Sequence, residues 1–227
     1  GGKELANRSS DPDVSHSNSL LKDINESLSK AGVSLQDVDV FACAVGPGSF
    51  TGLRIGIATV KALAATLNRP LVGVPTLHAV AHAAGPSAIT VALLPAGRGE
   101  MFAQMFSVSD SGAVTEKDAP AHLSPLKLIE RYGDLDDVIW AGAGAHAGRD
   151  LLQEHARQRG VRFMERQRDD PGVLGAGWQL APMPQSLARH VAALALRAFE
   201  QGKVQSAQTL KAIYVRPSDP ELKEQCR

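Results

Sequence analysis

The sequence has little cysteine, no net charge and no long uninterrupted hydrophobic run, and each absence excludes a class of protein. Two cysteines, Cys43 and Cys226, are too few for a disulfide framework and favour a reducing, cytoplasmic environment. The 24 Lys and Arg residues balance the 24 Asp and Glu residues, so the surface has no overall attraction for nucleic acid. The sequence contains no uninterrupted run of about 18 apolar residues, so it predicts no transmembrane helix. The first residues lack the apolar core of a signal peptide.

The sequence also lacks a complete set of catalytic or metal-binding residues. No Gly-x-Ser-x-Gly motif for a nucleophilic serine occurs. His78 and His82 have helical spacing, but no Glu follows His78 as the His-Glu-x-x-His zinc motif requires, and no third ligand is evident nearby. Cys43 lies within an expected strand, so we interpret it as a core residue rather than a nucleophile. We therefore expect no catalytic residue and no metal ligand in this chain.

What is present is a glycine-rich segment, residues 46–56, that directly follows the apolar run 38–45. This order predicts a strand, a tight turn and the start of a helix. Backbone N–H groups at a helix N-terminus can hold a phosphate. However, no Lys follows the glycines as in a phosphate loop, and Thr51 stands where a dinucleotide fingerprint has its third glycine. Nucleotide contact is therefore the weaker hypothesis for this turn, with candidate residues Gly46, Gly48, Ser49 and Thr51.

The helix expected over residues 50–67 carries Gly52 and Gly56 four residues apart, on one face. Glycine within a helix costs about 1 kcal/mol relative to alanine, which suggests compensation by the close approach of another backbone. The rest of this helix is apolar nearly all round, which is typical of a helix buried on several sides. Two interpretations remain open: a second chain covers the helix, or it is the central core helix of one chain.

Strands alternate with helices along the chain, which indicates an α/β protein with a largely parallel or mixed sheet. The similar order before and after residue 86 suggests two lobes, residues 1–86 and 87–227. The expected strands span residues 2–8, 38–45, 71–74, 88–94, 101–108 and 138–141. Helices are expected from about residue 15 or 16 to residue 31, over about 50–67, from 75 to about 84, from Ser124-Pro125 onward, from about 151 to about 158 and over 186–201. Residues 167–184 are expected to form a loop.

Several motifs of the sequence resemble those of a known family. The segment Gly46-Pro47-Gly48-Ser49-Phe50-Thr51-Gly52-Leu53-Arg54-Ile55-Gly56, followed by Gly73-Val74-Pro75-Thr76-Leu77, is similar to the signature of the TsaB (YeaZ) family. Residues 214–219 resemble its C-terminal Tyr-x-Arg-Pro-Ser-Asp segment, and residues 98–102 the start of its second-lobe hairpin. The resemblance covers nearly the whole chain. It implies an actin-like, two-lobed ASKHA fold with mixed sheets flanked by helices.

The resemblance also implies a function. Family members are non-catalytic subunits that pair with TsaD and support threonylcarbamoyl transfer to the adenosine beside the anticodon of ANN-reading tRNAs. The small ATPase TsaE joins the pair, tRNA is met through the complex, and a homodimer is expected when TsaD is absent. No cofactor is expected beyond ATP or ADP with magnesium at the TsaD interface. The alternatives are an independent ATP-binding enzyme of the actin–kinase class and, less favoured, a metallopeptidase.

The resemblance implies that the pairing surface is built from the first two helices. Its expected residues are His16, Leu20, Leu21, Ile24, Leu28, Phe50, Gly52, Leu53, Ile55, Gly56, Thr59, Val60 and Leu63. TsaD-like proteins hold a metal with a His-x-x-x-His pair in the first helix, and here the matching positions are His16 and Leu20, so no metal site is expected.

Two further expectations concern the chain start and a basic cluster. Family members open with a strand and an Asp-Thr-Ser turn, whereas this sequence begins downstream, so the first strand of the N-terminal lobe is expected to be absent. The arginines near residue 160 are interpreted as a solvated helix end and loop, with a weak contact to the tRNA backbone as the alternative. They are Arg157, Arg159, Arg162, Arg166 and Arg168.

Overall fold

The computed structural model describes residues 2–9, 16–167 and 175–215. The chain divides into two compact units: Gly1–Thr76 with Ser186–Ile213, and Leu77–Gln185 with Tyr214–Arg227. The expected lobe boundary at residue 86 thus differs from the division in the structure. The chain enters unit 2 earlier, and a late helix returns to unit 1.

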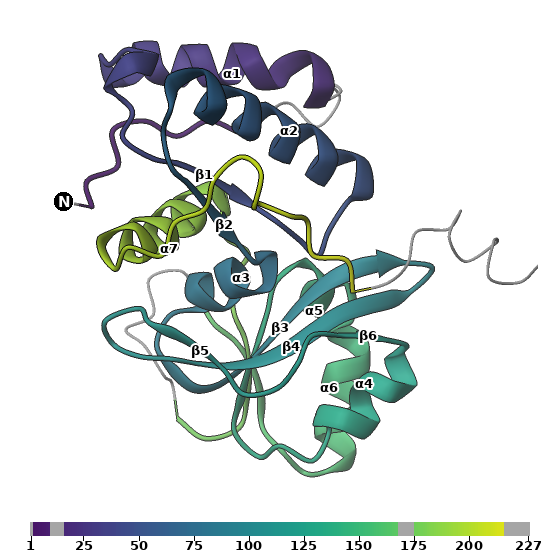
Figure 1. Ribbon diagram of the computed structural model, residues 1–227. Helices are drawn as coiled ribbons and strands as arrows, with labels where there is room; N and C mark the ends of the chain where they lie inside the picture. Colours follow the sequence, from purple (N-terminus) through teal and green to yellow (C-terminus); the bar gives the residue numbers. More distant parts are fainter. Residues whose placement is uncertain (1, 10–15, 168–174, 216–227) are drawn as a thin grey trace, which may run out of the picture. The chain divides into compact units, whose positions relative to one another are not determined.

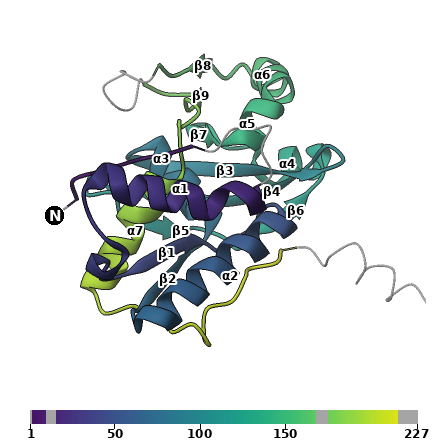
Figure 2. The ribbon, with the colours of Figure 1, turned by 90° about the horizontal axis from the view of Figure 1, so that it is seen from above.

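Unit 1 is built in three layers around a two-stranded parallel sheet (Figure 1). Helices α1 (His16–Ala31) and α2 (Phe50–Leu67) lie side by side on one face, and α7 (Ala188–Glu200) packs on the other (Figures 1 and 2). The strands are β1 (Phe41–Ala44) and β2 (Leu71–Val74), and a short 3-10 helix, η1 (Leu35–Asp37), precedes β1. The strand expected over residues 2–8 is wrong, because residues 2–9 form no helix or strand.

Local sequence explains where α2 begins and ends. The Ser49 Oγ accepts a hydrogen bond from the backbone N–H of Gly52 at 3.3 Å, which caps the first turn. At the other end, Asn68 adopts a left-handed conformation with φ 50° and stops the helix. In between, Ile57 and Ala64 face the sheet and join a buried cluster with Val45, Leu71 and Leu210.

A segment far along the sequence, which we call the strap (residues 205–213), completes unit 1. Gln205 exchanges two backbone hydrogen bonds with Leu71, at 2.8 and 2.9 Å. Its side-chain oxygen accepts from the N–H of Gly73 at 3.0 Å. Further along, the Leu210 carbonyl accepts from Lys61 Nζ at 3.2 Å, and the Ile213 N–H donates to the Val45 carbonyl at 2.7 Å. The strap therefore ties both strands and α2 together.

The strap accounts for one glycine in each of the motifs 46–56 and 73–77. A Cβ at Gly46 would collide with the Ile213 carbonyl oxygen, and the φ of Gly46 is +112°. A Cβ at Gly73 would lie 2.6 Å from Leu210 Cδ1 and 2.7 Å from Val45 Cγ1. Any side chain at these positions would displace the strap or the strands, so both glycines serve intramolecular packing.

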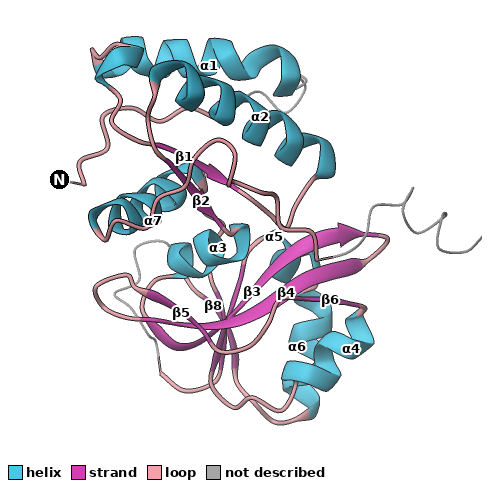
Figure 3. Ribbon diagram, in the orientation of Figure 1, coloured by secondary structure: helices cyan, strands magenta, loops and turns pink. Residues whose placement is uncertain are grey.

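Unit 2 contains a seven-stranded mixed sheet within the described residues, in the order β5-β4-β3-β7-β9-β8, with β6 also on β4. Its long strands β3 and β4 lie side by side (Figure 3). Strands β3 and β4 form an antiparallel hairpin, and β3, β7, β9 and β8 run parallel. The strands are β3 (Ser87–Gly97), β4 (Glu100–Val108), β5 (Val114–Glu116), β6 (Ala121–Leu123), β7 (Val138–Ala141), β8 (Phe163–Glu165) and β9 (Trp178–Leu180).

Helices cover both faces of this sheet. On one face Trp140 and Trp178 are fully buried, with ring centroids 4.9 Å apart, beneath α4 (Pro125–Tyr132), α5 (Ala143–Ala147) and α6 (Arg149–Gln158). On the other face lies α3 (Thr76–Ala84), whose His78 ring packs edge-on against Phe106 with centroids 4.8 Å apart.

Most long elements agree with the sequence-based expectation, and the short strands do not. The bounds of α2, β2 and β7 match the expected ranges. Strands β5, β6, β8 and β9 are three residues each and were not expected. In particular, β9 lies within the expected loop 167–184, of which residues 168–174 are outside the described residues. A three-residue strand has too few side chains to show a period of two.

The contact between the strap and β2 leads to a stability prediction. Gly73→Ala should destabilise the chain by about 1–3 kcal/mol because its methyl group overpacks the site against Leu210. Leu210→Ala should also destabilise, by about 2–5 kcal/mol, because it empties a buried position. The double variant should be more stable than the sum predicts, since one change makes room for the other. Urea unfolding of all four chains measures the coupling, and strict additivity would contradict it.

A second prediction concerns His78. Burial lowers its pKa from the ordinary value of 6.5, and this effect outweighs the attraction of Glu116, whose Oε1 lies 3.0 Å from Nε2. At pH values near and below 6.5, the unfolded chain therefore binds more protons at His78 than the folded chain does. The contribution of His78 to stability falls as pH drops below about 6.5. A histidine NMR titration should find a pKa below 6.5, lower still in Glu116→Gln. A value above 6.5 in the wild-type chain would show that the ion pair dominates instead.

Candidate partner interface

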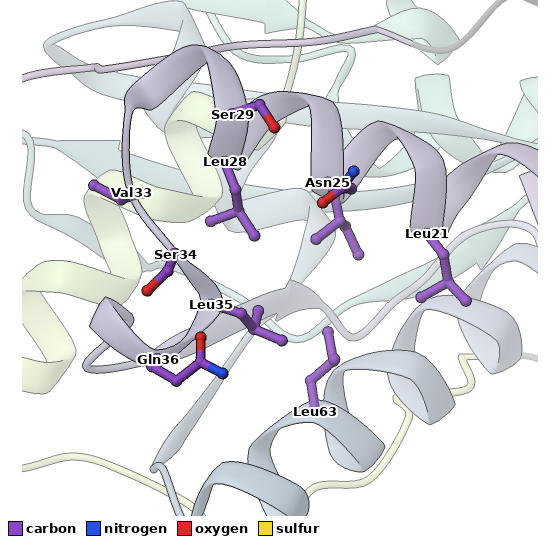
Figure 4. A pocket seen from close by; sticks show the side chains of 10 residues that line it. Leu21, Asn25, Leu28, Ser29, Val33, Ser34, Leu35, Gln36 and Leu63 are labelled. Carbon is purple, nitrogen blue, oxygen red and sulfur yellow. The ribbon is translucent and has the colours of Figure 1, made fainter.

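A pocket of about 390 Å³, lined by six apolar and four polar residues, lies between α1, η1 and α2 (Figure 4). Leu21, the most exposed of its apolar residues at 65 %, reaches it from α1, and Leu63 reaches it from α2. The remaining lining residues are Ile24, Asn25, Leu28, Ser29, Val33, Ser34, Leu35 and Gln36. The pocket therefore places leucine and isoleucine side chains of both helices where a second surface can reach them.

Helix α2 continues this apolar surface on its outward face. Of its 18 residues only Ile57 and Ala64 are buried. Helical spacing puts one exposed row opposite those two, and every member of that row is uncharged. Its members are Thr51, Ile55, Ala58, Ala62 and Thr66, of which only Ile55 is partly covered.

An uncharged helix face of this length is unusual on a monomer, since surface helices normally carry polar residues there. The length and composition of α2 alone would also allow it to cross a membrane. Its other face, however, packs on the sheet of unit 1, and Lys61 bonds to the strap. The alternative that α2 is a central core helix is wrong, because so little of it is covered within the described chain.

The structure brings most of the expected interface residues together. Leu20, Ile24, Leu28, Ile55, Thr59 and Leu63 are half-buried along α1 and α2, and Leu21 and Phe50 are exposed. Gly56 has no atom within 4 Å of the position of a Cβ, so the close approach that its spacing suggested does not occur among the described residues of this chain. At Gly52 the Cβ would meet only Ser49, with Oγ at 3.4 Å.

Three of the expected residues lie elsewhere or are not described at the side chain. Leu53 and Val60 pack against the buried cluster of unit 1 rather than on the outward face. His16 begins α1, and its side chain is outside the description. Conversely, Ala58, Ala62 and Thr66 belong to the outward face and were missed, although the helical period from Thr51 and Ile55 points to them.

The glycine-rich turn is shaped by contacts within the chain. Gly46 is covered by Ile213 of the strap, and its carbonyl accepts from the Thr76 N–H at 2.7 Å. The Ser49 side chain already accepts from Gly52, one of the N–H groups that a phosphate at this helix start would use. Gly48 and Thr51 are exposed. The nearest cation along the sequence, Arg54, stacks over the Phe50 ring at 3.8 Å from its centroid.

The other candidate groups have structural roles. Arg157 pairs with Glu154 through two hydrogen bonds, at 2.7 and 2.9 Å. Arg159 donates to the carbonyls of Gly133 and Leu135 beyond the end of α4, and Arg166 donates to that of Ala84. These contacts favour the interpretation of a helix end and loop. Arg162 is exposed, and Arg168 is outside the described residues.

No group of three or more His, Cys, Asp or Glu side chains suited to a metal ion occurs in the part of the chain that the structure describes. His78 of the candidate His78–His82 pair is engaged by Glu116. Cys43 is partly buried in β1, and burial raises the pKa of its thiol to about 11. A thiol with so high a pKa is a poor nucleophile at neutral pH.

Comparisons with known proteins agree with this architecture. The model of a family described as TsaD, tRNA N6-adenosine threonylcarbamoyltransferase, matches residues 11–192. The tRNA threonylcarbamoyladenosine biosynthesis protein TsaB of Escherichia coli is 28% identical over 205 residues, which are 88% of this chain and 80% of that protein. A tRNA N6-adenosine threonylcarbamoyltransferase of Aeropyrum pernix is 49% identical over 59 residues, or 26% of this chain and 16% of that enzyme.

A solved structure, YeaZ from Pseudomonas aeruginosa, superimposes with a TM-score of 0.66 at 25% sequence identity, covering 88% of this chain and 84% of that one. Mixed sheets flanked by helices, together with these matches, define an α/β protein of the ASKHA-like class. The chain belongs to the TsaD family, and its full-length likeness is to the TsaB (YeaZ) members.

The Cys43 thiol gives a simple chemical test of the assignment to the core. In a Cys226→Ser variant, iodoacetamide should alkylate Cys43 of the folded chain at least tenfold more slowly than in urea, because a pKa of about 11 leaves little thiolate at pH 8. Mass spectrometry of the quenched reaction measures both rates. Equal rates would mean that Cys43 is an accessible, reactive thiol.

Proposed function

We propose that this chain is a non-catalytic subunit that pairs with a TsaD-like protein through α1 and α2. The observation that carries the proposal is the uncovered apolar surface of these helices, from the Leu21 side of the pocket to Ala62 on the outward face of α2. Burying such surface contributes about 25 cal/mol per Å², and monomers rarely expose a large contiguous patch of it.

The proposed role is support of threonylcarbamoyl transfer to the adenosine beside the anticodon of ANN-reading tRNAs. Membership of the family supports involvement in the biosynthesis of tRNA threonylcarbamoyladenosine. A subunit role is supported by the side chains, since the described residues contain no three-ligand metal cluster and Cys43 is a poor nucleophile. In this proposal the TsaD-like partner contributes the transferase centre.

Further parts of the proposal concern the assembly. A TsaE-like ATPase joins the pair, tRNA is bound through the complex, and in the absence of the partner two copies of this chain associate through the same surface. Any ATP or ADP with magnesium is bound at the interface with the TsaD-like partner and not by this chain alone. The working compartment is the cytoplasm.

The first test is pairing itself. Light scattering of this chain mixed at micromolar concentration with the TsaD-like protein of the same organism should give the mass of a heterodimer. Adding the TsaC-type and TsaE-type proteins, threonine, bicarbonate, ATP and tRNA should then yield threonylcarbamoyladenosine, detected by mass spectrometry of tRNA digests. Modification at the same rate without this chain would contradict the proposed role.

The surface is tested with a matched pair of variants. Ala62→Leu adds bulk at the exposed outward face of α2, and Ala193→Leu adds the same bulk at an exposed position of α7 in the same unit. We expect Ala62→Leu to weaken pairing roughly tenfold or more by overpacking the contact, while Ala193→Leu leaves it unchanged. Both variants should keep the thermal stability of the isolated chain, because neither site is buried. Equal affinities would move the interface away from α2.

A third variant, Gly56→Leu, probes the half of α2 that faces the pocket. Because no atom lies near its Cβ position, the isolated chain should tolerate the change and gain helix propensity, about 0.5–1 kcal/mol. Pairing should again weaken.

For the alternative of an independent ATP-binding enzyme, isothermal titration of ATP and magnesium into the isolated chain is decisive: saturable heat with hydrolysis would favour that enzyme over the subunit role.

A further inference from the structure

Charge is distributed very unevenly around the outward face of α2. The whole chain is neutral, with 24 basic and 24 acidic residues. Residues 40–76 and 201–215, which form β1, α2, β2 and the strap, contain no Asp or Glu at all. They contain five basic side chains: Arg54, Lys61, Arg69, Lys203 and Lys211. Within the described chain none of these five belongs to an ion pair.

Two of these positive charges, Arg54 and Lys61, lie on α2 beside its uncharged outward face. Arg54 and Lys61 are seven residues apart, so they lie in one row with Ala65 along the flank of the outward face, next to Ala58 of that face. Lys61 donates to the Leu210 carbonyl and Arg69 to the Gln36 carbonyl at 3.1 Å, so among the described residues neither cation is paired with a carboxylate. Arg54 is exposed at the first turns of α2, its guanidinium over the Phe50 ring, and the helix dipole adds to the positive potential there.

From this arrangement we propose that the protein surface covering α2 has an apolar centre and carboxylate side chains at its edge, directed at Arg54. The inference rests on the proposed function, since it describes the face of the TsaD-like partner. Opposite charges at the rim of an interface speed association and exclude wrong partners more than they add affinity. The charge row then selects and orients the partner, and the apolar row of Ile55, Ala58 and Ala62 holds it.

A protein partner fits this surface better than the backbone of a nucleic acid does. Phosphate contacts need cations that point into the contact area, and the centre of this surface is uncharged. An apolar centre with charge at the rim is the usual anatomy of a protein interface. Phe50, exposed at 37 % beneath Arg54, supplies an aromatic side chain of the kind enriched in such interfaces.

The test compares two charge reversals of equal size. Arg54→Glu acts at the proposed rim, and Lys127→Glu reverses an exposed cation on α4 of unit 2, so both change the net charge by the same amount. Stopped-flow association with the TsaD-like partner is measured over a range of salt. We expect Arg54→Glu to slow association roughly tenfold at low salt, with the difference closing at high salt, and Lys127→Glu to have little effect. Arg54→Gln should lie between the wild-type chain and Arg54→Glu.

The possible outcomes separate this inference from the function on which it rests. If the wild-type chain pairs and Arg54→Glu associates as Lys127→Glu does, the acidic rim is wrong and the pairing stands. If the wild-type chain does not pair, both fail. If instead tRNA alone binds the chain and Arg54→Glu abolishes that binding while partner association is unchanged, the cation row is a phosphate contact and the inference is overturned. Circular dichroism of each variant confirms that α2 is intact.

Discussion

The packing of the strap across β1 and β2 is the contact on which unit 1 depends. Leu210 joins Val45, Ile57, Ala64 and Leu71 in one buried cluster, so a residue near the end of the chain closes the core that the early strands and α2 begin. The strap backbone passes so close to Gly46 and Gly73 that neither position has room for a side chain. The turn that starts α2 is therefore set by a segment more than 150 residues away in sequence.

This constraint separates the two faces of α2. On one face of α2, the side chains pack against the strap and the sheet; they are Leu53, Ile57, Val60 and Ala64. The hydrogen bond from Lys61 to the Leu210 carbonyl holds the flank of the helix. What is left uncovered is a face of small and apolar residues beside the pocket with Leu63. A helix that is anchored on one side and bare on the other is a rigid element on which a partner can dock without reordering it, which lowers the entropic cost of association.

In unit 2, several charged and titratable side chains bond to other groups of the same unit. Arg159 and Arg166 satisfy carbonyl groups at chain ends and turns, and His78 fills a site between α3 and β5. Asp118 accepts hydrogen bonds from the Met105 N–H at 2.7 Å and the Tyr132 hydroxyl at 2.7 Å, which ties α4 to the sheet. These side chains therefore stabilise the fold of unit 2.

Most of the long elements and the family resemblance could be predicted from the residues alone. The range expected for α2, about 50–67, agrees with the structure, in which the Ser49 cap and the left-handed Asn68 are local features that set its two ends. The order of strands and helices was enough for an α/β fold, and the motifs 46–56 and 73–77 were enough for the family. Local signals could not show the return of α7 and the strap to unit 1, because that depends on contacts between residues far apart in the chain.

The roles of the glycines become clear only from the folded chain. From the sequence, Gly46 was a candidate for phosphate binding, and Gly52 and Gly56 for close helix packing. In the structure Gly46 makes room for the Ile213 carbonyl, and Gly56 faces open space. A glycine in the sequence suggests that a Cβ would not fit at that position. Whether the space is occupied by another segment of the chain, by a ligand or by a second protein depends on the tertiary contacts formed there.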